Sequence, residues 1–182
     1  ALARGDITLA EIGSQPGLWE EALRVFGEQA DRVVNFWFQG NYEQVIFTGC
    51  GSTYYLGVIG ATQLQAATGI PARAYSASEL MLFPQSTFLP GLRTLLICVS
   101  RSGTTRETVE AARRFHAQGT GNVLVVTCHS ESLLAEEADL LLAIDAARED
   151  SRVQTRSFSS MAVILTALAA ACGGDDWRAL NA

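Results

Sequence analysis

The sequence contains no lysine, two histidines and four widely spaced cysteines among its 182 residues. Without lysine it offers neither a side-chain amine for a Schiff base nor the lysine of a Walker-type phosphate loop. The cysteines show neither Cys-x-x-Cys spacing nor the density of a secreted disulfide framework, so we expect reduced core residues in a cytoplasmic protein. With so few scattered cysteines and histidines, we also expect no metal site.

Positive charge is scarce as well, with 13 basic against 19 acidic residues and a net charge of −6. No cluster of arginines exceeds the pair Arg113-Arg114, so we expect no nucleic-acid partner. We find no signal peptide and no uninterrupted apolar run of the ~20 residues that a spanning helix requires, and therefore expect no membrane association. Any anion site must then be built from local hydroxyls and peptide dipoles.

The sequence does contain a regular alternation of helical and strand-like apolar segments, and its 48% hydrophobic content suits one well-filled domain. A short N-terminal segment is expected to stop at Gln15-Pro16. Periodicity predicts helices over about 18–38, 52–68, 105–117 and 155–171, a weaker helix over 133–138, and strands over 45–48, 72–75, 94–99, 123–127 and 140–144. This order is typical of an α/β fold, a three-layer sandwich whose five-stranded parallel sheet carries helices on both faces.

Three polar loops follow the first, third and fifth predicted strands, at residues 49–53, 100–105 and 145–154. Ligands of such sheets bind beyond the carboxyl ends of the strands, where neighbouring connections diverge. If the first and third strands are neighbours, the loops should therefore converge on one cleft.

The loop Ser100-Arg101-Ser102-Gly103-Thr104-Thr105 places four hydroxyls directly before a predicted helix. A helix start exposes unpaired N–H groups and the positive end of the helix dipole. One helix cap needs only one hydroxyl, so four hydroxyls predict a pocket for phosphate or a similar anion.

The loop Gly49-Cys50-Gly51-Ser52-Thr53 leaves two interpretations open: a ligand-binding loop, or a tight turn in which Ser52 or Thr53 merely caps the next helix. It is not a dinucleotide fingerprint, because Tyr54 occupies the third glycine position. At a helix start the Cys50 thiol could have a lowered pKa, although a small packing residue is the simpler interpretation.

Four further residues are candidates near the cleft. Arg101, Arg152 and Arg156 would either grip phosphate or carboxylate oxygens or remain solvated. His129 follows the fourth strand and is either a proton shuttle or a hydrogen-bonding loop residue.

Taken together, these motifs resemble the sugar isomerase (SIS) domain family over about residues 8–172. The resemblance is carried by residues 49–54, by Ala77-Ser78-Glu79-Leu80, by residues 100–105 and by Glu149 through Phe158. The start, Glu11-Ile12 followed by Gln15-Pro16, is similar to that of the isomerase portion of glucosamine-6-phosphate synthase.

The resemblance implies a phosphosugar site with no cofactor. The residues it assigns to substrate binding are Ser100, Arg101, Ser102, Gly103, Thr105, Cys50, Gly51, Ser52, Thr53, Arg152, Val153 and Gln154. The family's pattern has Lys where this chain has Arg156, and the synthase has Gln where it has Arg101. The run from Ser100 to Gly103 is closer to the sugar-phosphate deaminases and the tagatose-6-phosphate ketose/aldose isomerases.

The resemblance also implies that catalytic groups are missing. Isomerisation needs a base and a ring-opening acid, which in two-domain family members come from the second SIS repeat or a dimer partner. Glu149 is the internal candidate for the base. We expect one SIS domain over 1–174, with a helical extension over about 1–40, and a linker or tail over 175–182 leading toward a second repeat.

The expected function is therefore phosphosugar binding by the first half of an aldose–ketose isomerase or deaminase that acts on a hexose or aminohexose 6-phosphate. The expected assembly is a homodimer or a pairing with a second SIS repeat. The alternatives are a non-catalytic domain that senses a sugar phosphate and, less well supported, an NAD-binding half.

Overall fold

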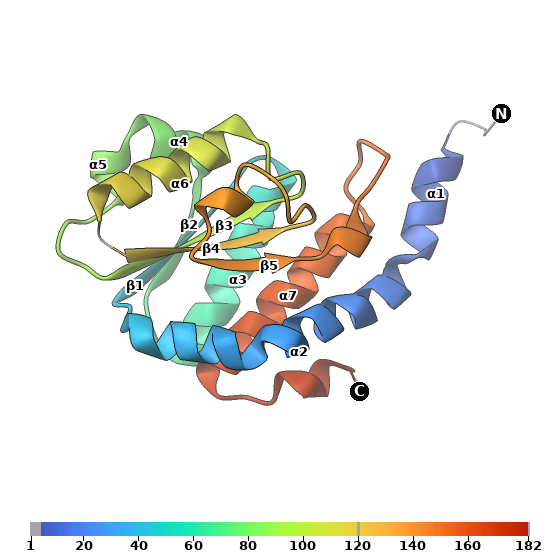
Figure 1. The fold of residues 1–182 in the computed structure, drawn as a ribbon, viewed down its shortest axis with the longest axis horizontal. Coiled ribbons are helices and arrows are strands. Elements are labelled where there is room, and N and C mark those ends of the chain that lie inside the picture. Colours follow the sequence, from blue (N-terminus) through green and yellow to red (C-terminus); the bar gives the residue numbers. More distant parts are fainter. Residues whose placement is uncertain (1–4, 120, 182) are drawn as a thin grey trace.

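The computed structural model describes residues 5–119 and 121–181 and contains a parallel sheet of five strands between layers of helices (Figure 1). The sheet order is β2-β1-β3-β4-β5. The strands are β1 (Gln44–Gly49), β2 (Ala72–Ser76), β3 (Thr94–Ser100), β4 (Gly121–Thr127) and β5 (Leu140–Ala143), and each neighbouring pair is parallel. The expected α/β sandwich with a five-stranded parallel sheet is confirmed.

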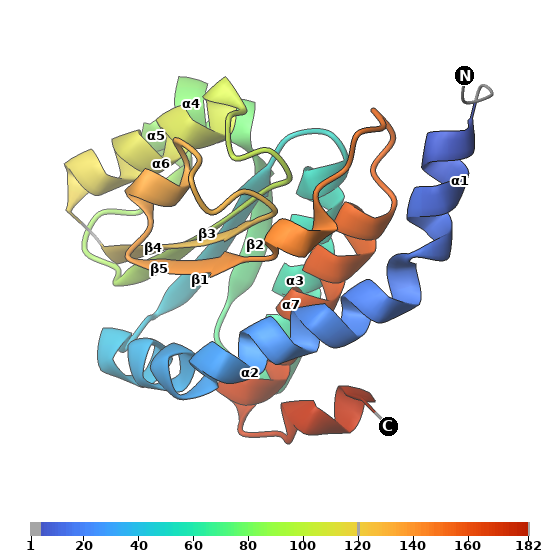
Figure 2. The same ribbon diagram turned by 45° about the vertical axis from the view of Figure 1, so that its right-hand side comes forward.

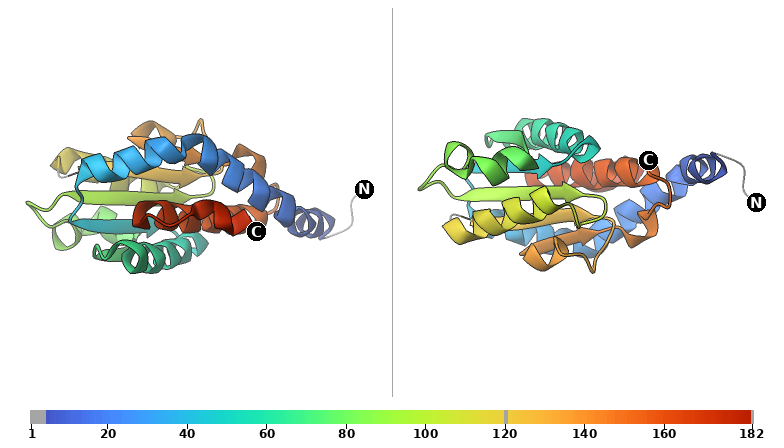
Figure 3. Two further views of the ribbon diagram at one scale, coloured as in Figure 1. Left: turned by 90° about the horizontal axis from the view of Figure 1, so that it is seen from below. Right: turned by 90° about the horizontal axis from the view of Figure 1, so that it is seen from above.

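Helices cover both faces of this sheet (Figures 2 and 3). One face packs against α2 (Gln15–Gly40), α3 (Ser52–Thr68) and α7 (Arg156–Gly173). The other face packs against α4 (Ala77–Leu82) and α6 (Arg106–Gln118), with α5 (Pro84–Thr87) following α4. Burial on both faces explains why β3 is buried along its whole length and reads as an unbroken apolar run.

The strand order places a topological switch at β1 and β3. These two strands are adjacent and pair from Gln44↔Thr94 to Thr48↔Cys98, so their carboxyl ends lie side by side. After β1 the chain enters α3 on one face, whereas after β3 it enters α6 on the other. The two connections therefore diverge above neighbouring strand ends, which is the condition for a ligand cleft at this edge.

The N-terminal segment ends at Ser14, next to the expected stop at Gln15-Pro16, and these two residues begin the following helix. It forms α1 (Asp6–Gly13), and α2 then begins at Gln15 with Pro16 in its first turn. A proline is tolerated there because the first N–H groups of a helix have no intrahelical partner. Residues 1–4 of the expected helical extension lie outside the described residues.

The weak helix expected over 133–138 is only the single 3₁₀ turn η1 (Ala135–Glu137). Asp139, two residues later, pairs with Val123: its N–H donates to the Val123 carbonyl at 2.9 Å, and its carboxylate accepts the Val123 N–H at 2.7 Å. These contacts draw the chain into β5 after one turn. A second 3₁₀ turn, η2 (Asp145–Ala147), follows β5.

The last helix, α7, is long and apolar enough to cross a bilayer by length and composition, with a mean hydropathy of 1.4 over 18 residues. More than half of it is buried against the rest of the fold, chiefly α2 and α3, which accounts for its composition. The segment after it, expected as a linker or tail, forms η3 (Trp177–Asn181), and the Trp177 ring packs edge-on against Phe26 at 5.2 Å. Residue 182 lies outside the described residues.

Candidate functional site

The loop after β3 is organised by its own hydroxyls. The Gly103 N–H donates to Ser100 Oγ at 3.2 Å, and the Ser100 hydroxyl reaches Thr105 Oγ1 at 3.5 Å. Ser102 Oγ accepts from the Thr104 N–H at 3.3 Å and from the Thr104 hydroxyl at 3.0 Å. Ser100 is buried, whereas Ser102 and Thr105 are partly exposed. Ser100 thus shapes the loop, and the hydroxyls of Ser102 and Thr105, which only accept in these contacts, keep their capacity to donate.

Two further features describe this loop, the close packing of Gly103 and the start of α6. Gly103 has φ +62°, and a Cβ at this position would come within 1.9 Å of Ser132 Oγ, so only glycine fits. Thr105 is the N-cap residue of α6, yet its side chain makes no capping hydrogen bond within the described part of the chain. The positive end of the α6 dipole therefore lies beside two available hydroxyls.

The loop after β1 is more self-contained. Thr53 is buried, and its hydroxyl accepts the Cys50 N–H at 3.0 Å while donating to the Cys50 carbonyl at 2.9 Å. Gly51 has φ +59° and precedes Ser52, which is exposed at the first position of α3. In this loop the side chain that faces solvent is therefore Ser52, while Thr53 closes the turn.

The Cys50 thiol lies between the two connections. It accepts a hydrogen bond from the Thr108 hydroxyl of α6 at 3.8 Å, which brings the loop after β1 under the helix that follows β3. Burial raises the pKa of the Cys50 thiol, so it is protonated at neutral pH. This environment matches a packing residue rather than a reactive thiolate.

Glu149, the internal candidate for a catalytic base, holds the start of α7. Its side chain is fully buried. One carboxylate oxygen accepts the Thr155 N–H at 2.6 Å and the Thr155 hydroxyl at 2.8 Å, and the other accepts the Ser157 hydroxyl. These contacts form a helix cap supplied from outside the helix.

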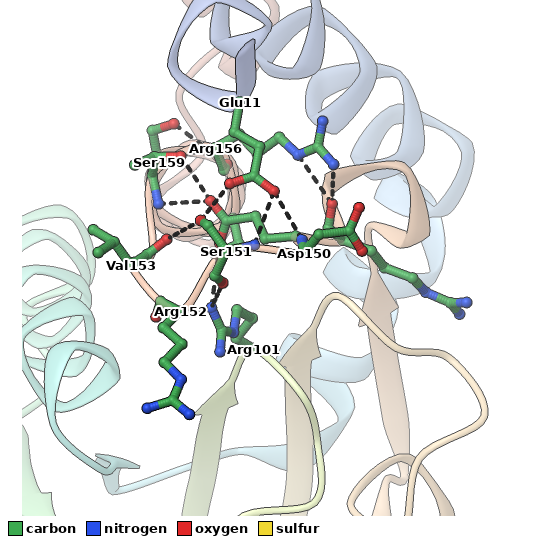
Figure 4. Close-up of polar contacts among 12 residues, drawn as sticks. Glu11, Arg101, Asp150, Ser151, Arg152, Val153, Arg156 and Ser159 are labelled. Atoms are coloured by element: carbon green, nitrogen blue, oxygen red, sulfur yellow. Dashed lines mark hydrogen bonds and ion pairs between the residues drawn. The ribbon is translucent and has the colours of Figure 1, made fainter. Parts of the chain in front are cut away.

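Arg101 connects the loop after β3 to the loop before α7. Its Nη1 donates to the carbonyls of Ser151 at 3.2 Å and Arg152 at 3.3 Å, and lies 3.6 Å from Oε2 of Glu149 (Figure 4). Nη1 of Arg101 is therefore occupied by contacts within the protein. Of the neighbouring residues assigned to substrate binding, Arg152 and Val153 are exposed. Gln154 Oε1 is buried and has no hydrogen-bond partner among the described residues.

The same loop is held from its other side by Glu11 of α1, a residue to which sequence reasoning assigned no role. Its carboxylate accepts the N–H groups of Asp150 at 2.8 Å and Ser151 at 3.2 Å, together with the Ser151 hydroxyl (Figure 4). No local pattern links Glu11 to residues so distant along the chain. The only signal was its place in the N-terminal stretch that resembles the SIS family.

The charge state of Glu11 follows from these contacts. Burial acts most strongly, raising its pKa, but the hydrogen bonds from the Ser151 hydroxyl and the two backbone N–H groups outweigh burial, with a smaller effect from Arg156. The pKa of Glu11 is therefore lowered, and the group is a carboxylate at neutral pH. Arg156 itself donates through Nε to the Arg148 carbonyl at 2.9 Å, so its guanidinium also braces the loop.

Next to the loop over residues 100–105, called the hydroxyl loop from here on, lies a cavity of about 210 Å³. It is lined by Ser102, Thr104, His129, Glu131, Ser132 and Arg148. Burial, and then the positive charge of Arg148, lowers the pKa of His129, which is therefore neutral at neutral pH. Across residues 5–119 and 121–181, no group of three or more His, Cys, Asp or Glu side chains could hold a metal ion.

Comparison with known proteins connects this arrangement to one family. The profile of the SIS domain matches residues 41–172. A glutamine–fructose-6-phosphate aminotransferase (isomerizing) of Chlamydia caviae is 27% identical over 164 residues. A protein of Streptomyces coelicolor, named as a candidate D-galactosamine-6-phosphate deaminase, is 30% identical over 165 residues. The crystal structure of tagatose-6-phosphate ketose/aldose isomerase from Escherichia coli superimposes with a TM-score of 0.84 at 27% identity.

These matches cover most of the chain but less than half of each relative. They span 88% of the chain and 26% of the aminotransferase, 85% of the chain and 43% of the deaminase-like protein, and 91% of the chain and 48% of the isomerase. The chain therefore corresponds to one part of longer proteins, and the activity of those whole proteins does not transfer to it directly.

Proposed function

The chain belongs to the SIS domain family, and we propose that it binds the phosphosugar substrate of an aldose–ketose isomerase or a deaminase acting on a hexose or aminohexose 6-phosphate. The names of the three relatives support this substrate class, because each contains a hexose or hexosamine 6-phosphate.

The observation that carries the proposal is the hydroxyl loop at the switch point. The hydroxyls of Ser102 and Thr105 would donate to the phosphate oxygens, together with the amides at the start of α6. Ser100 would act indirectly, since its hydroxyl already accepts the Gly103 N–H and donates to Thr105. Neutral donors suit a chain without lysine, because hydrogen bonds to an anion are stronger than those between neutral groups.

The sugar would lie toward the loop over 149–154. There the buried Gln154 Oε1 is an acceptor that lacks a partner among the described residues, and a sugar hydroxyl would satisfy it. Arg152 and the Ser52 hydroxyl are exposed at the same edge of the sheet and would complete the polar contacts. Cys50, Gly51, Thr53 and Arg101 would support the site by shaping its loops.

We propose that the proton-transferring groups come from a second SIS repeat or from a partner copy. Glu149, the internal candidate, is fully buried and already accepts three hydrogen bonds while facing Arg101. A group so engaged is poorly placed to take a proton from substrate carbon.

Calorimetric titration tests the proposal. Wild-type protein should bind hexose 6-phosphates and, more weakly, inorganic phosphate, but not the unphosphorylated sugars. Ser102→Ala should weaken binding of both phosphorylated ligands by about 1–2 kcal/mol, because one hydrogen bond to a charged group is lost. Ser86→Ala, an exposed serine in α5, is the matched control and should bind like wild type. Equal affinities of wild type and Ser102→Ala would refute the phosphate assignment.

A sugar-phosphate sensor is the second candidate, and the engaged state of Glu149 favours it. A sensor needs the binding loops but no base, whereas an isomerase needs both. Ketose–aldose interconversion measured on the full-length gene product separates the two: turnover supports the enzyme, and tight binding without turnover supports the sensor.

A further inference from the structure

Helix α1 is joined to the rest of the molecule by a charged residue instead of an apolar face. Among its eight residues, all of them described, Glu11 alone is buried, at 3% exposure. The large apolar side chains of α1 remain exposed, with Ile7 at 42%, Leu9 at 70% and Ile12 at 45%. Figure 1 shows α1 projecting from the body beyond the start of α2. The buried contact of α1 is thus the carboxylate of Glu11.

This placement is unfavourable for the helix itself. Glu11 lies in the last turn of α1, where the negative end of the helix dipole disfavours a carboxylate. It also approaches a segment that carries two further acids, Glu149 and Asp150. A buried carboxylate at such a position needs compensation from specific donors, and residues that break local rules this way occur at functional sites.

The compensation comes from the loop that would face the sugar. Glu11 accepts the N–H groups of Asp150 and Ser151, while Arg101 donates to the carbonyls of Ser151 and Arg152. The backbone at Ser151 is therefore held from two sides, by an acceptor from α1 and by a donor from the loop after β3. Figure 4 shows Glu11 above this loop and Arg101 below it.

We propose that Glu11 is a positioning residue of the phosphosugar site: it fixes the backbone at 150–151, and through it the segment 152–154, without touching the substrate. This inference rests on the proposed function, since it concerns the sugar side of that same site. The phosphate side is built from the hydroxyl loop, whose internal hydrogen bonds do not involve Glu11.

The test compares two ligands: a hexose 6-phosphate, which would contact both the hydroxyl loop and the segment 152–154, and inorganic phosphate, which would contact the hydroxyl loop alone. Glu11→Ala should lower the affinity for a hexose 6-phosphate by about tenfold. Without Glu11 the loop over 150–154 is less ordered in the free protein, so part of the binding free energy must be spent on ordering it. The affinity for inorganic phosphate should stay within about twofold of wild type, because phosphate meets only the hydroxyl loop. Glu11→Gln should lie between, since its amide oxygen still accepts the two backbone N–H groups.

Hydrogen exchange provides the second measurement. In Glu11→Ala the amides of residues 150 and 151 should exchange faster, whereas those of β3 should not change. Glu20→Ala, which removes an exposed carboxylate from the start of α2, is the matched control and should leave both affinities and the exchange pattern unchanged. If the alanine variant does not fold, Glu11→Gln carries the same comparison with a smaller expected effect.

The possible results distinguish a failure of the positioning role of Glu11 from a failure of the proposed function. Wild-type protein that binds no hexose 6-phosphate overturns the proposed function and this inference with it. Wild-type binding with an unchanged Glu11→Ala affinity overturns the positioning role alone. An equal loss for hexose 6-phosphate and inorganic phosphate also overturns it, because Glu11 would then act on the fold as a whole.

Discussion

The guanidinium of Arg101 lies 3.6 Å from the carboxylate of Glu149, and this pair joins the loop that leaves β3 to the loop that enters α7. The carboxylate is fully buried, while about a quarter of the Arg101 side chain is exposed. Arg101 also binds two backbone carbonyls, so it supplies both charge and hydrogen bonds to the same loop. A buried carboxylate without its cationic partner is costly, which makes this pair a sensitive point of the site.

Arg101→Ala should lower the free energy of unfolding by about 1–3 kcal/mol, because Glu149 stays buried and two carbonyls lose a donor. Urea denaturation monitored by tryptophan fluorescence measures this. Arg114→Ala is the control: Arg114 forms an exposed pair with Glu110 on α6 and should cost no more than about 0.5 kcal/mol. Equal losses for the two variants would contradict the assigned role of Arg101.

Glu149→Ala should destabilise the protein by about 2 kcal/mol or more, since the Thr155 N–H and the Ser157 hydroxyl lose their buried acceptor at the start of α7. Thermal unfolding followed by circular dichroism measures the loss. Glu136→Ala, at an exposed position in η1, should unfold like wild type. A fully stable Glu149→Ala protein would argue that the carboxylate serves something other than the helix cap.

Gly103→Ala and Gly119→Ala form a matched pair, with φ values of +62° and +65°. Both substitutions strain the backbone by about 1 kcal/mol. Only at Gly103 does the new Cβ collide, meeting Ser132 Oγ at 1.9 Å, whereas nothing lies within 4 Å at Gly119. Gly103→Ala should therefore be the less stable variant in chemical denaturation and should bind inorganic phosphate more weakly, and identical behaviour would refute the close approach.

The lowered pKa of Glu11 predicts a loss of stability in acid. Its ordinary value of 4.5 applies to the unfolded chain, so the ionised group stabilises the fold above pH 4.5, and this contribution disappears as the pH falls through the lower folded pKa. Burial opposes ionisation of the carboxylate, whereas the Ser151 hydroxyl and the Asp150 and Ser151 N–H groups as donors and the positive charge of Arg156 favour it. The difference in unfolding free energy between wild type and Glu11→Gln should therefore shrink below pH 4.5, and a difference that stays constant to pH 3 would contradict this.

Much of the fold was predictable because its signals are local. The apolar run from Thr94 to Val99 defined the central strand, and Gly69 marked the end of α3, where it adopts the left-handed conformation that glycine tolerates. Local signals were less exact at the start of α2. Periodicity predicted a helix from about residue 18, whereas α2 begins at Gln15 with Pro16 in its first turn, a position that accepts proline.

In the candidate site, too, local features could be predicted and contacts between distant segments could not. The hydroxyl loop could be found because its residues are consecutive and lie at a strand end, which is a property of the chain itself. The roles of Glu149, Arg101 and Glu11 could not, because each depends on a partner in a different segment. The sequence alone does not distinguish a carboxylate that caps a helix from one that stabilises a loop or accepts a proton.

The sequence by itself determined the alternation of strands and helices and the place of the hydroxyls proposed to bind phosphate, since hydrophobic period and turn chemistry act over a few residues. Its ordered motifs carried the resemblance to the family. The tertiary structure alone decided how those hydroxyls are used and what holds the opposite loop. The Ser100 hydroxyl accepts the Gly103 N–H within its own loop. The Glu11 carboxylate, on α1, accepts the N–H of Ser151. Such pairings arise when packing brings distant backbone donors to a buried charge, because burial leaves each polar group to be satisfied by whatever the fold places beside it.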